Sequence, residues 1–299
     1  MSQDWGQNNE GVAQPVGTAL SLKSFDRFAN YITREIGIKM PESKMTLVQS
    51  RLLRRARELR LGSIDEYGEY FFAGSNSEER EYFINAITTN KTDFFREPEH
   101  FEFLVRTALP NLLSGVDPRL SRLNIWSAAC SSGQEPYTLA MILREYAVKR
   151  PGLNFAILGT DISTKVLDHA RKAVYEEALT APIPVALRRR YMLRSKDSSS
   201  DLVRVSPALR AKVSFHQLNL MNESYRIQDM FDIVFCRNVL IYFDRKTQES
   251  VICKICQNIN PGGYLFVGHS ESLAGMDVPV NQVKTAVFRM PFSGGTRQQ

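Results

Sequence analysis

The chain has 299 residues, of which 43% are hydrophobic and 23% charged, and its formal net charge is +6 at pH 7. This balance indicates a globular protein with one large domain or two unequal ones, and it excludes collagen-like and wholly disordered chains. No stretch approaches the roughly 18 uninterrupted apolar residues of a transmembrane helix. The polar N-terminus lacks the basic start and apolar core of a signal peptide, and four cysteines are too few for a disulfide framework. We therefore expect a cytoplasmic protein that is not inserted in a membrane.

The first part of the chain is expected to be helical. Residues 1–20 are predicted to form a flexible leader and residues 21–90 a small all-helical domain, because the periodicity is helical and no convincing strand occurs. The clearest helix is predicted over residues 46–61. A capping box formed by Ser75 and Glu78 predicts the start of another helix.

The helix predicted over residues 46–61 has a strongly basic face. Its apolar stripe on the other side consists of Met45, Val48, Leu52, Ala56 and Leu59. Arg51, Arg54 and Arg55 fall opposite this stripe, and residues 39–60 hold seven basic side chains but only two acidic ones. Such a face suits the docking of an acidic partner, although a solvated charged surface would give the same pattern.

From Leu123 onward, short β-branched and aromatic runs alternate with amphipathic segments. Strands are expected at residues 123–129, 155–160, 213–216, 232–236 and 264–267, and helices at residues 135–148, 164–174 and 245–257. This alternation predicts an α/β fold over residues 91–292, with a doubly wound, mostly parallel Rossmann-like sheet.

Two features interrupt this alternation. Residues 189–194 and 202–205 are typical of strands, which predicts a small β insertion over about residues 186–212 beside the main sheet. A final strand over residues 285–290 follows no helix of crossover length, so we expect it to lie antiparallel at the sheet edge. Residues 293–299 are expected to form a flexible tail.

Ligands of doubly wound sheets bind beyond the carboxyl ends of the strands. The segment Ala128–Pro136 after the first strand has small residues and a single glycine, Gly133, before a helix. Asp161 follows the second strand and suits the two hydroxyls of a ribose. A dinucleotide needs several glycines around its pyrophosphate, whereas a nucleoside without phosphate, such as S-adenosylmethionine, does not. The residues alone leave both ligands open, as well as an ordinary turn with Asp161 as a helix cap.

Five motifs in chain order together resemble the CheR family of chemotaxis protein methyltransferases. They are Thr88–Glu97, Ser131–Tyr137, Thr160–Ile162, Phe235–Asp244 and Gly268–Ser272. The resemblance extends over about residues 23–290, and the helical first domain and the β insertion agree with it. It implies a methyltransferase sheet preceded by a small all-helical domain.

The resemblance implies that the chain binds S-adenosylmethionine, releases S-adenosylhomocysteine, and methylates glutamate side chains of bacterial chemoreceptors. The residues implied to contact the methyl donor are Asn90, Thr92, Arg96, Glu135, Asp161, Asn219, Leu220, Arg237 and Asn238. Arg96 and Tyr242 are expected to be catalytic, with Tyr242 nearest the methyl acceptor. The alternative for Tyr242 is core packing beside Phe243.

The implied chemistry needs no general base. A glutamate carboxylate with a pKa of about 4.3 is ionised at neutral pH and can attack a sulfonium methyl group directly. Arg237, at the end of the fourth strand, can pair with the carboxylate of the methyl donor. Catalysis would come mainly from orientation. No metal site is predicted, because Cys253 and Cys256 belong to one helix without a second ligand pair.

The implied partners are the cytoplasmic methylation helices of chemoreceptors, which are expected to be rich in glutamate. The basic face formed by Arg51, Arg54 and Arg55 would dock such a helix. In part of the family the β insertion also binds a short tether peptide at the receptor C-terminus. The connecting segment Ser195–Asp201 contains no glycine, so this second contact stays open.

Two other functions compete with this interpretation. The basic composition suits a nucleic-acid methyltransferase, but such enzymes carry an Asn/Asp-Pro-Pro-aromatic motif where this chain has Arg237-Asn238-Val239. Stacking aromatic residues are also absent from the basic helix, so we expect no nucleic-acid partner. A non-catalytic module that binds the donor or its product as a signal would share most of these residues, and only an assay of methyl transfer separates it.

Overall fold

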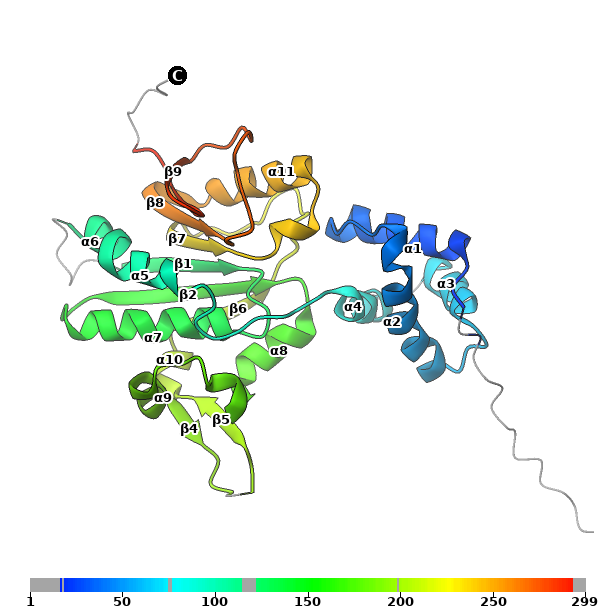
Figure 1. Ribbon diagram of the computed structural model, residues 1–299, viewed down its shortest axis with the longest axis horizontal. Coiled ribbons are helices and arrows are strands. Elements are labelled where there is room, and N and C mark those ends of the chain that lie inside the picture. The colour runs from blue at the N-terminus through cyan, green and yellow to red at the C-terminus, as the bar shows by residue number, and fades with distance from the viewer. Residues whose placement is uncertain (1–16, 18, 75–76, 115–121, 198, 293–299) are drawn as a thin grey trace, which may run out of the picture. The chain divides into compact units, whose positions relative to one another are not determined.

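The computed structural model describes residues 17, 19–74, 77–114, 122–197 and 199–292. Contacts divide the chain into two compact units (Figure 1). The helical unit consists of Met1–Ile32 and Met40–Ile87, and the sheet unit consists of Thr33–Lys39 and Thr88–Gln299. No helix within the described ranges is long and apolar enough to cross a membrane.

The helical unit has an aromatic core. Its described elements are α1 (Leu22–Ile36), the 3₁₀ turn η1 (Glu42–Lys44), α2 (Met45–Glu58), α3 (Ile64–Phe72) and α4 (Ser77–Ile87). Phe83 from α4 lies 4.7 Å from the Phe71 ring and 5.4 Å from the Phe28 ring, measured between centroids. Aromatic pairs at this distance stabilise a core beyond the area that they bury. The core therefore joins α1, α3 and α4.

The structure confirms most of the helix predicted over residues 46–61, which is α2. The buried residues on its apolar stripe are Val48, Leu52 and Ala56. The helix ends at Glu58 rather than Leu61, because Arg60 adopts a left-handed φ of 58°. The predicted capping residue Ser75 lies outside the described residues, and α4 is described from Ser77.

The sheet unit is built on a seven-stranded sheet with the order β6-β2-β1-β7-β8-β10-β9. Its strands are β1 (Arg122–Ala128), β2 (Asn154–Asp161), β6 (Val213–Gln217), β7 (Phe231–Cys236), β8 (Ile259–Val267), β9 (Asn281–Lys284) and β10 (Val287–Arg289). The first five strands in this order run parallel, whereas β10 is antiparallel to both of its neighbours. The predicted α/β fold with a doubly wound, mostly parallel sheet is confirmed.

Helices cover both faces of this sheet. The helices of the sheet unit are α5 (Pro98–Phe103), α6 (Leu109–Leu112), α7 (Gln134–Val148), α8 (Thr164–Lys172), α9 (Val185–Tyr191), α10 (Pro207–Arg210) and α11 (Arg245–Cys256), of which α9 belongs to the β insertion. Ile125 and Phe235 join a core on one face with α5 and α7, while Trp126 and Val234 join a core on the other face with α11. Because apolar packing occupies both faces of the sheet, polar side chains that could bind a ligand are found at the ends of the strands.

The β insertion differs in part from the expectation. Its sheet has the order β3-β5-β4, with β3 (Val174–Glu176), β4 (Met192–Arg194) and β5 (Leu202–Val205), and it lies below α7 in Figure 1. The strand expected over residues 189–194 is wrong in its first half, because α9 begins after Pro184 and continues to Tyr191. The insertion also begins before residue 186, since Ala173 ends α8 with a φ of 53° and β3 follows.

The final strand is antiparallel, as expected, but it is not at the edge. β10 pairs with β8 on one side and with β9 on the other, so β9 forms the edge. All four residues of β9 are exposed. The alternation that reveals a half-buried strand is therefore missing from this segment, which explains why the sequence did not predict it.

Candidate functional site

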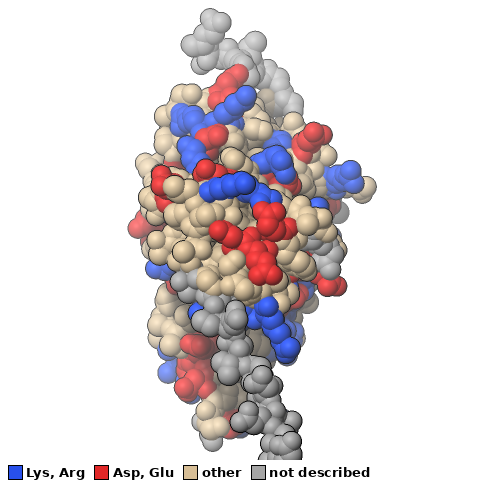
Figure 2. All heavy atoms as spheres, turned by 90° about the vertical axis from the view of Figure 1, so that its right-hand side faces the viewer, with Lys and Arg blue, Asp and Glu red and all other residues tan. Residues whose placement is uncertain are grey.

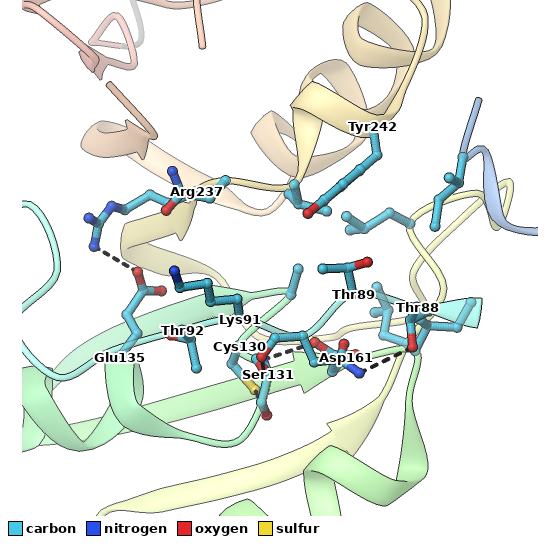
Figure 3. A pocket seen from close by; sticks show the side chains of 18 of the residues that line it. Thr88, Thr89, Lys91, Thr92, Cys130, Ser131, Glu135, Asp161, Arg237 and Tyr242 are labelled. Atoms are coloured by element: carbon cyan, nitrogen blue, oxygen red, sulfur yellow. Dashed lines mark hydrogen bonds and ion pairs between the residues drawn. The ribbon is translucent and has the colours of Figure 1, made fainter. Parts of the chain in front are cut away.

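The carboxyl ends of β1, β2 and β7 meet where the strand order reverses, and a cavity that is open to solvent at its mouth lies there (Figure 3). Its lining is drawn entirely from the sheet unit. The lining includes Asn90, Thr92, Arg96, Glu135, Asp161, Asn219, Leu220, Arg237, Asn238 and Tyr242. The structure thus brings together every residue that the resemblance implied for donor contact or catalysis.

The loop after β1 has an unusual backbone. Ala129 and Ser131 have φ values of 57° and 52°, and Gly133 follows with a φ of 94°. A side chain at Gly133 would bring its Cβ within 2.8 Å of Ala170 Cβ, so this position requires glycine. Gly133 precedes α7 as its N-cap residue. The single glycine of this loop therefore allows the chain to turn tightly into α7, and it is not part of a phosphate-binding loop.

Asp161 ends β2 and connects two loops. Its Oδ2 accepts a hydrogen bond from Ser131 N and its Oδ1 from Ser163 N, both at 2.9 Å. Burial raises the pKa of this carboxyl above its ordinary value, against the effect of these bonds. Ser163, not Asp161, caps α8 by accepting from Val166 N. Each carboxylate oxygen can accept another hydrogen bond, as a ribose diol would require.

Arg237 follows β7 and is held between two carboxylates. Its side chain is 2% exposed. Nη1 lies 2.9 Å from Glu135 Oε2, and Nη2 lies 2.9 Å from Glu97 Oε2 and donates to Arg96 O at 2.6 Å. The expectation that Arg237 stands ready to pair with a donor carboxylate needs correction, because its charge is already compensated. It joins the end of β7 to α7 and to the segment around Arg96.

The two carboxylates beside Arg237 have further partners. Glu135 Oε1 accepts from Ser127 Oγ at 2.6 Å, and Glu97 Oε1 accepts from Asn238 Nδ2 at 3.0 Å. Burial opposes the ionisation of Glu97, but hydrogen bonds from Asn238 and Arg237 outweigh it and lower its pKa. Glu97 therefore stays charged well below neutral pH and keeps the guanidinium compensated. No pattern in the sequence predicts this role for Glu97.

The segment that leads to Arg96 forms one wall of the cavity. Asn90 O accepts a hydrogen bond from Ser131 Oγ at 2.8 Å, which joins this wall to the loop after β1. Phe95 and Glu97 have φ values of 54° and 56°, so the half-buried Arg96 lies between two left-handed residues. Backbone strain of this kind clusters at functional sites.

The opposite wall includes residues that the sequence does not point to. Asn219 Nδ2 donates to Glu35 O at 2.7 Å and so holds the segment Thr33–Lys39 beside the loop after β6. This segment contributes Ile36 and Ile38 to the lining. Because the sequence places both residues next to a helical domain, nothing in their pattern connects them with the strand ends.

Tyr242 ends the 3₁₀ turn η4 (Leu240–Tyr242) and is half-buried in the cavity wall. In Figure 3 its side chain extends from this turn toward the cavity. Its neighbour Phe243 is buried in the core and also lines the cavity. Tyr242 also packs against this core, as one of the two alternatives left open by the sequence predicted.

Glu271, in the loop after β8, is a second buried carboxylate without a predicted role. It accepts hydrogen bonds from the backbone N–H groups of Asn238, Leu240 and Gly268 at 2.9, 2.7 and 2.5 Å. The motif around Gly268 contained this residue. Sequence alone gave no indication that its partners are backbone amides of another loop.

Arginines on the basic face of α2 bind other residues of the helical unit. Arg55 Nη2 lies 2.6 Å from Glu79 Oε2, and the side chain of Glu79 is only 3% exposed. Arg51 donates to Ile87 O, whereas the side chain of Arg54 is 80% exposed. Figure 2, the view that faces this unit, shows basic and acidic side chains next to one another rather than a continuous basic surface.

Among the described residues, Glu97, His100 and His269 bring ligand atoms of the kind that binds metals within 4.8 Å of one another. Glu97 is already paired with Arg237, and a guanidinium at this position repels a cation. Burial lowers the pKa of His100 to about 3, so this imidazole is neutral. We therefore assign no metal to this cluster.

A mostly parallel sheet of this kind, with an acidic residue ending the second strand beside a cavity at the switch point, is the arrangement of the class of nucleotide- and nucleoside-binding α/β domains. The chain matches the descriptions "CheR methyltransferase, SAM binding domain" over residues 90–288 and "CheR methyltransferase, all-alpha domain" over residues 23–88. It therefore belongs to the CheR methyltransferase family, and S-adenosylmethionine is its cofactor.

Relatives from three bacteria are similar over nearly the whole chain. The chain is 37% identical over 271 residues to "Chemotaxis protein methyltransferase" of Salmonella typhimurium, which covers 91% of each chain. It is 39% identical over 266 residues to "Chemotaxis protein methyltransferase 2" of Pseudomonas aeruginosa, covering 89% of this chain and 92% of the relative. It is 37% identical over 258 residues to "Chemotaxis protein methyltransferase" of Borreliella burgdorferi, covering 86% and 90%.

Proposed function

We propose that this protein transfers the methyl group of S-adenosylmethionine to glutamate side chains of bacterial chemoreceptors and forms methyl esters for chemotactic adaptation. The observation that carries the proposal is one cavity at the ends of β1, β2 and β7, which gathers all the expected donor contacts together with Tyr242. The similarity to chemotaxis protein methyltransferases supports a receptor as the substrate.

The residues of the cavity fit the parts of the methyl donor. The Asp161 carboxylate would accept hydrogen bonds from the ribose hydroxyls, and Ile36 and Leu220 offer apolar surface for the adenine. Glu135 offers a carboxylate for the ammonium group, and Arg96 offers a guanidinium for the carboxylate. The remaining proposed contacts are Asn90, Thr92, Asn219, Arg237 and Asn238.

The chain's own residues have a positioning task in this reaction. When bound, S-adenosylmethionine supplies a methyl group on a positively charged sulfur, which a carboxylate oxygen attacks directly. The receptor glutamate is ionised at neutral pH, so no side chain has to remove a proton. Arg96 would balance the charge of the arriving carboxylate, and the Tyr242 hydroxyl would donate a hydrogen bond that orients it. Correct orientation alone can lower a barrier by several kcal/mol.

We further propose that the basic face of α2 meets the glutamate-rich methylation helices of the receptor. Arg54 is the most exposed of its three arginines, while Arg51 and Arg55 add positive charge close to the surface. Complementary charge of this kind mainly raises the association rate and selects the partner. Because the methylation helices are cytoplasmic, the proposed location of this protein is the cytoplasm.

A groove in the β insertion suits the tether peptide of some receptors. Its lining is Glu177, Val185, Arg188, Arg189, Met192, Arg194 and Val203. Apolar side chains beside guanidinium groups fit a short peptide that carries aromatic and acidic residues. Calorimetric titration with such a C-terminal pentapeptide tests this contact, and an absence of binding at millimolar peptide would remove it.

The test of the proposed function is transfer of a labelled methyl group to membranes that contain chemoreceptors. We expect label on the receptor that is released as methanol by mild base, because carboxylate methyl esters are base-labile. Receptor-free membranes and nucleic acid should stay unlabelled. Binding of S-adenosylhomocysteine without any transfer would instead identify a non-catalytic module.

A further inference from the structure

One buried carboxylate outside the cavity lining connects two loops of the sheet unit. Glu271 is 7% exposed, and its Oε2 accepts from the backbone N–H groups of Asn238 at 2.9 Å and Gly268 at 2.5 Å. Its Oε1 accepts from the backbone N–H groups of Leu240 at 2.7 Å and Ile241 at 3.3 Å. One side chain therefore satisfies four backbone donors in loops that follow the neighbouring strands β7 and β8.

Three of these donors belong to the loop that carries site residues. The loop leads from β7 into η4 and supplies Arg237, Asn238, Val239 and Tyr242 to the cavity lining. Asn238 has a φ of 58°, in the left-handed region that asparagine adopts more readily than most other residues with a side chain. The first N–H groups of η4, from Leu240 and Ile241, have no partner within the turn, so Glu271 caps it.

Two carboxylates thus hold Asn238 from different sides. Glu97 accepts from its side-chain amide, and Glu271 accepts from its backbone N–H. The packing between the two loops is tight, because a Cβ at Gly268 would lie 2.6 Å from Asn238 Nδ2 and 2.8 Å from Glu271 Oε2. A substitution of Glu271 therefore alters the contacts of Asn238 and of the first residues of η4.

We propose that Glu271 is a positioning residue for methyl transfer. Glu271 accepts three backbone N–H groups of one loop and thereby fixes the position of Asn238 relative to Tyr242. Asn238 belongs to the proposed binding site of the methyl donor, and Tyr242 lies where the methyl acceptor is proposed to bind. This inference rests on the proposed function. A carboxamide of the same size cannot replace it, because its NH₂ group would face backbone N–H groups in place of an acceptor oxygen.

The test compares the full chain with Glu271→Gln and with a matched control, Glu249→Gln. Glu249 also accepts a backbone N–H, from Asp277 at 3.2 Å, but it does not line the cavity. We expect Glu271→Gln to raise the dissociation constant of S-adenosylhomocysteine at least tenfold. At saturating donor, we expect kcat to fall at least tenfold while the KM for receptor stays within twofold. Glu249→Gln should match the wild type in all three quantities.

Calorimetry separates positioning from mere loss of folded protein. Unfolded material would lower the binding stoichiometry and leave the dissociation constant unchanged. Folded Glu271→Gln protein with wild-type dissociation constant and kcat would overturn the proposal. If this variant does not fold, Gly268→Ala provides the second test, because its Cβ pushes Asn238 and Glu271 apart. The same tenfold effects are expected, and wild-type values would overturn the proposal. A wild-type chain that does not bind S-adenosylhomocysteine would contradict the proposed function itself.

Discussion

Arg237 and Glu135 form an ion pair, with 2.9 Å between Nη1 and Oε2, that joins the end of β7 to the first turn of α7. Glu97 lies on the other side of the same guanidinium. A charge buried this deeply depends on its partners, because an uncompensated buried charge costs several kcal/mol. The pair therefore holds together the part of the cavity where the amino-acid end of the donor is expected.

Removing one charge of this pair should weaken both the fold and the site. Glu135→Gln should lower the free energy of unfolding by about 1.5–3 kcal/mol, the range for a hydrogen bond to a charged group. It should also weaken the binding of S-adenosylhomocysteine. Urea denaturation and calorimetry measure the two effects. The control is Glu145→Gln on the same helix, which keeps an acceptor oxygen for Tyr191 and loses only the charge paired with the exposed Arg190, so it should lower the free energy of unfolding less. Equal effects of both variants would contradict the assignment.

Asp161→Asn should weaken donor binding without unfolding the sheet unit. The amide keeps the size of the side chain but replaces one acceptor oxygen by a donor, and it loses the charge that would hold the ribose. We expect a dissociation constant for S-adenosylhomocysteine that is about tenfold to hundredfold higher, from about 1.5–3 kcal/mol. Asp168→Asn, on the exposed side of α8, is the control. Unchanged affinity in Asp161→Asn would remove Asp161 from the donor site.

Tyr242→Phe should separate catalysis from donor binding. The variant keeps the ring that packs against the core but loses the hydroxyl proposed to orient the receptor carboxylate. We expect kcat to fall about tenfold, while the affinity for S-adenosylhomocysteine stays within twofold, because orientation affects the transition state. Tyr146→Phe, on the side of α7 away from the cavity lining, should leave kcat unchanged. A wild-type kcat in Tyr242→Phe would limit Tyr242 to packing.

Local patterns predicted the elements that are long and periodic, and topology predicted the position of the site. The rule that parallel sheets bind ligands at the ends of their strands is enough to select Asp161 from the sequence. The partners of Glu97 and Glu271 lie more than 30 residues away in most cases, and several are backbone amides. No residue pattern reports such partners, so both carboxylates were missed.

The basic face of α2 illustrates the same limit. Periodicity correctly placed Arg54 opposite the buried stripe, because its side chain is 80% exposed. It was wrong for Arg51, which is half-buried and donates to Ile87 O, and for Arg55, which is only 22% exposed and pairs with the buried Glu79. Helical periodicity describes one helix, whereas this pair depends on how α2 and α4 pack.

This pairing changes the test of receptor docking. Arg55→Ala should lower the stability of the helical unit by about 3–5 kcal/mol, because it removes the guanidinium that pairs with the buried carboxylate of Glu79. Arg54→Ala should change stability by less than about 1 kcal/mol. It should raise the KM for receptor several-fold and leave donor affinity unchanged. Thermal unfolding and receptor methylation measure these effects. An unchanged KM in Arg54→Ala at low salt would contradict docking through this face.

His100 should make the protein less stable as the pH falls below neutral. Burial lowers its pKa to about 3, from 6.5 in the unfolded chain. Between these values the unfolded state binds more protons, so the free energy of unfolding falls by up to about 1.4 kcal/mol per pH unit as the pH decreases. His100→Gln does not titrate, so its stability should change less steeply between pH 4 and pH 6. Equal slopes in denaturant titrations would show that His100 does not remain neutral.

The most direct measurement of the central claim is mass spectrometry of receptor peptides after incubation with the protein and S-adenosylmethionine. Methyl groups are predicted on glutamate side chains as base-labile esters, and they should be strongly reduced with the Asp161→Asn and Tyr242→Phe variants. Methyl groups on another residue type, or an unmodified receptor despite tight donor binding by the wild-type chain, would contradict it.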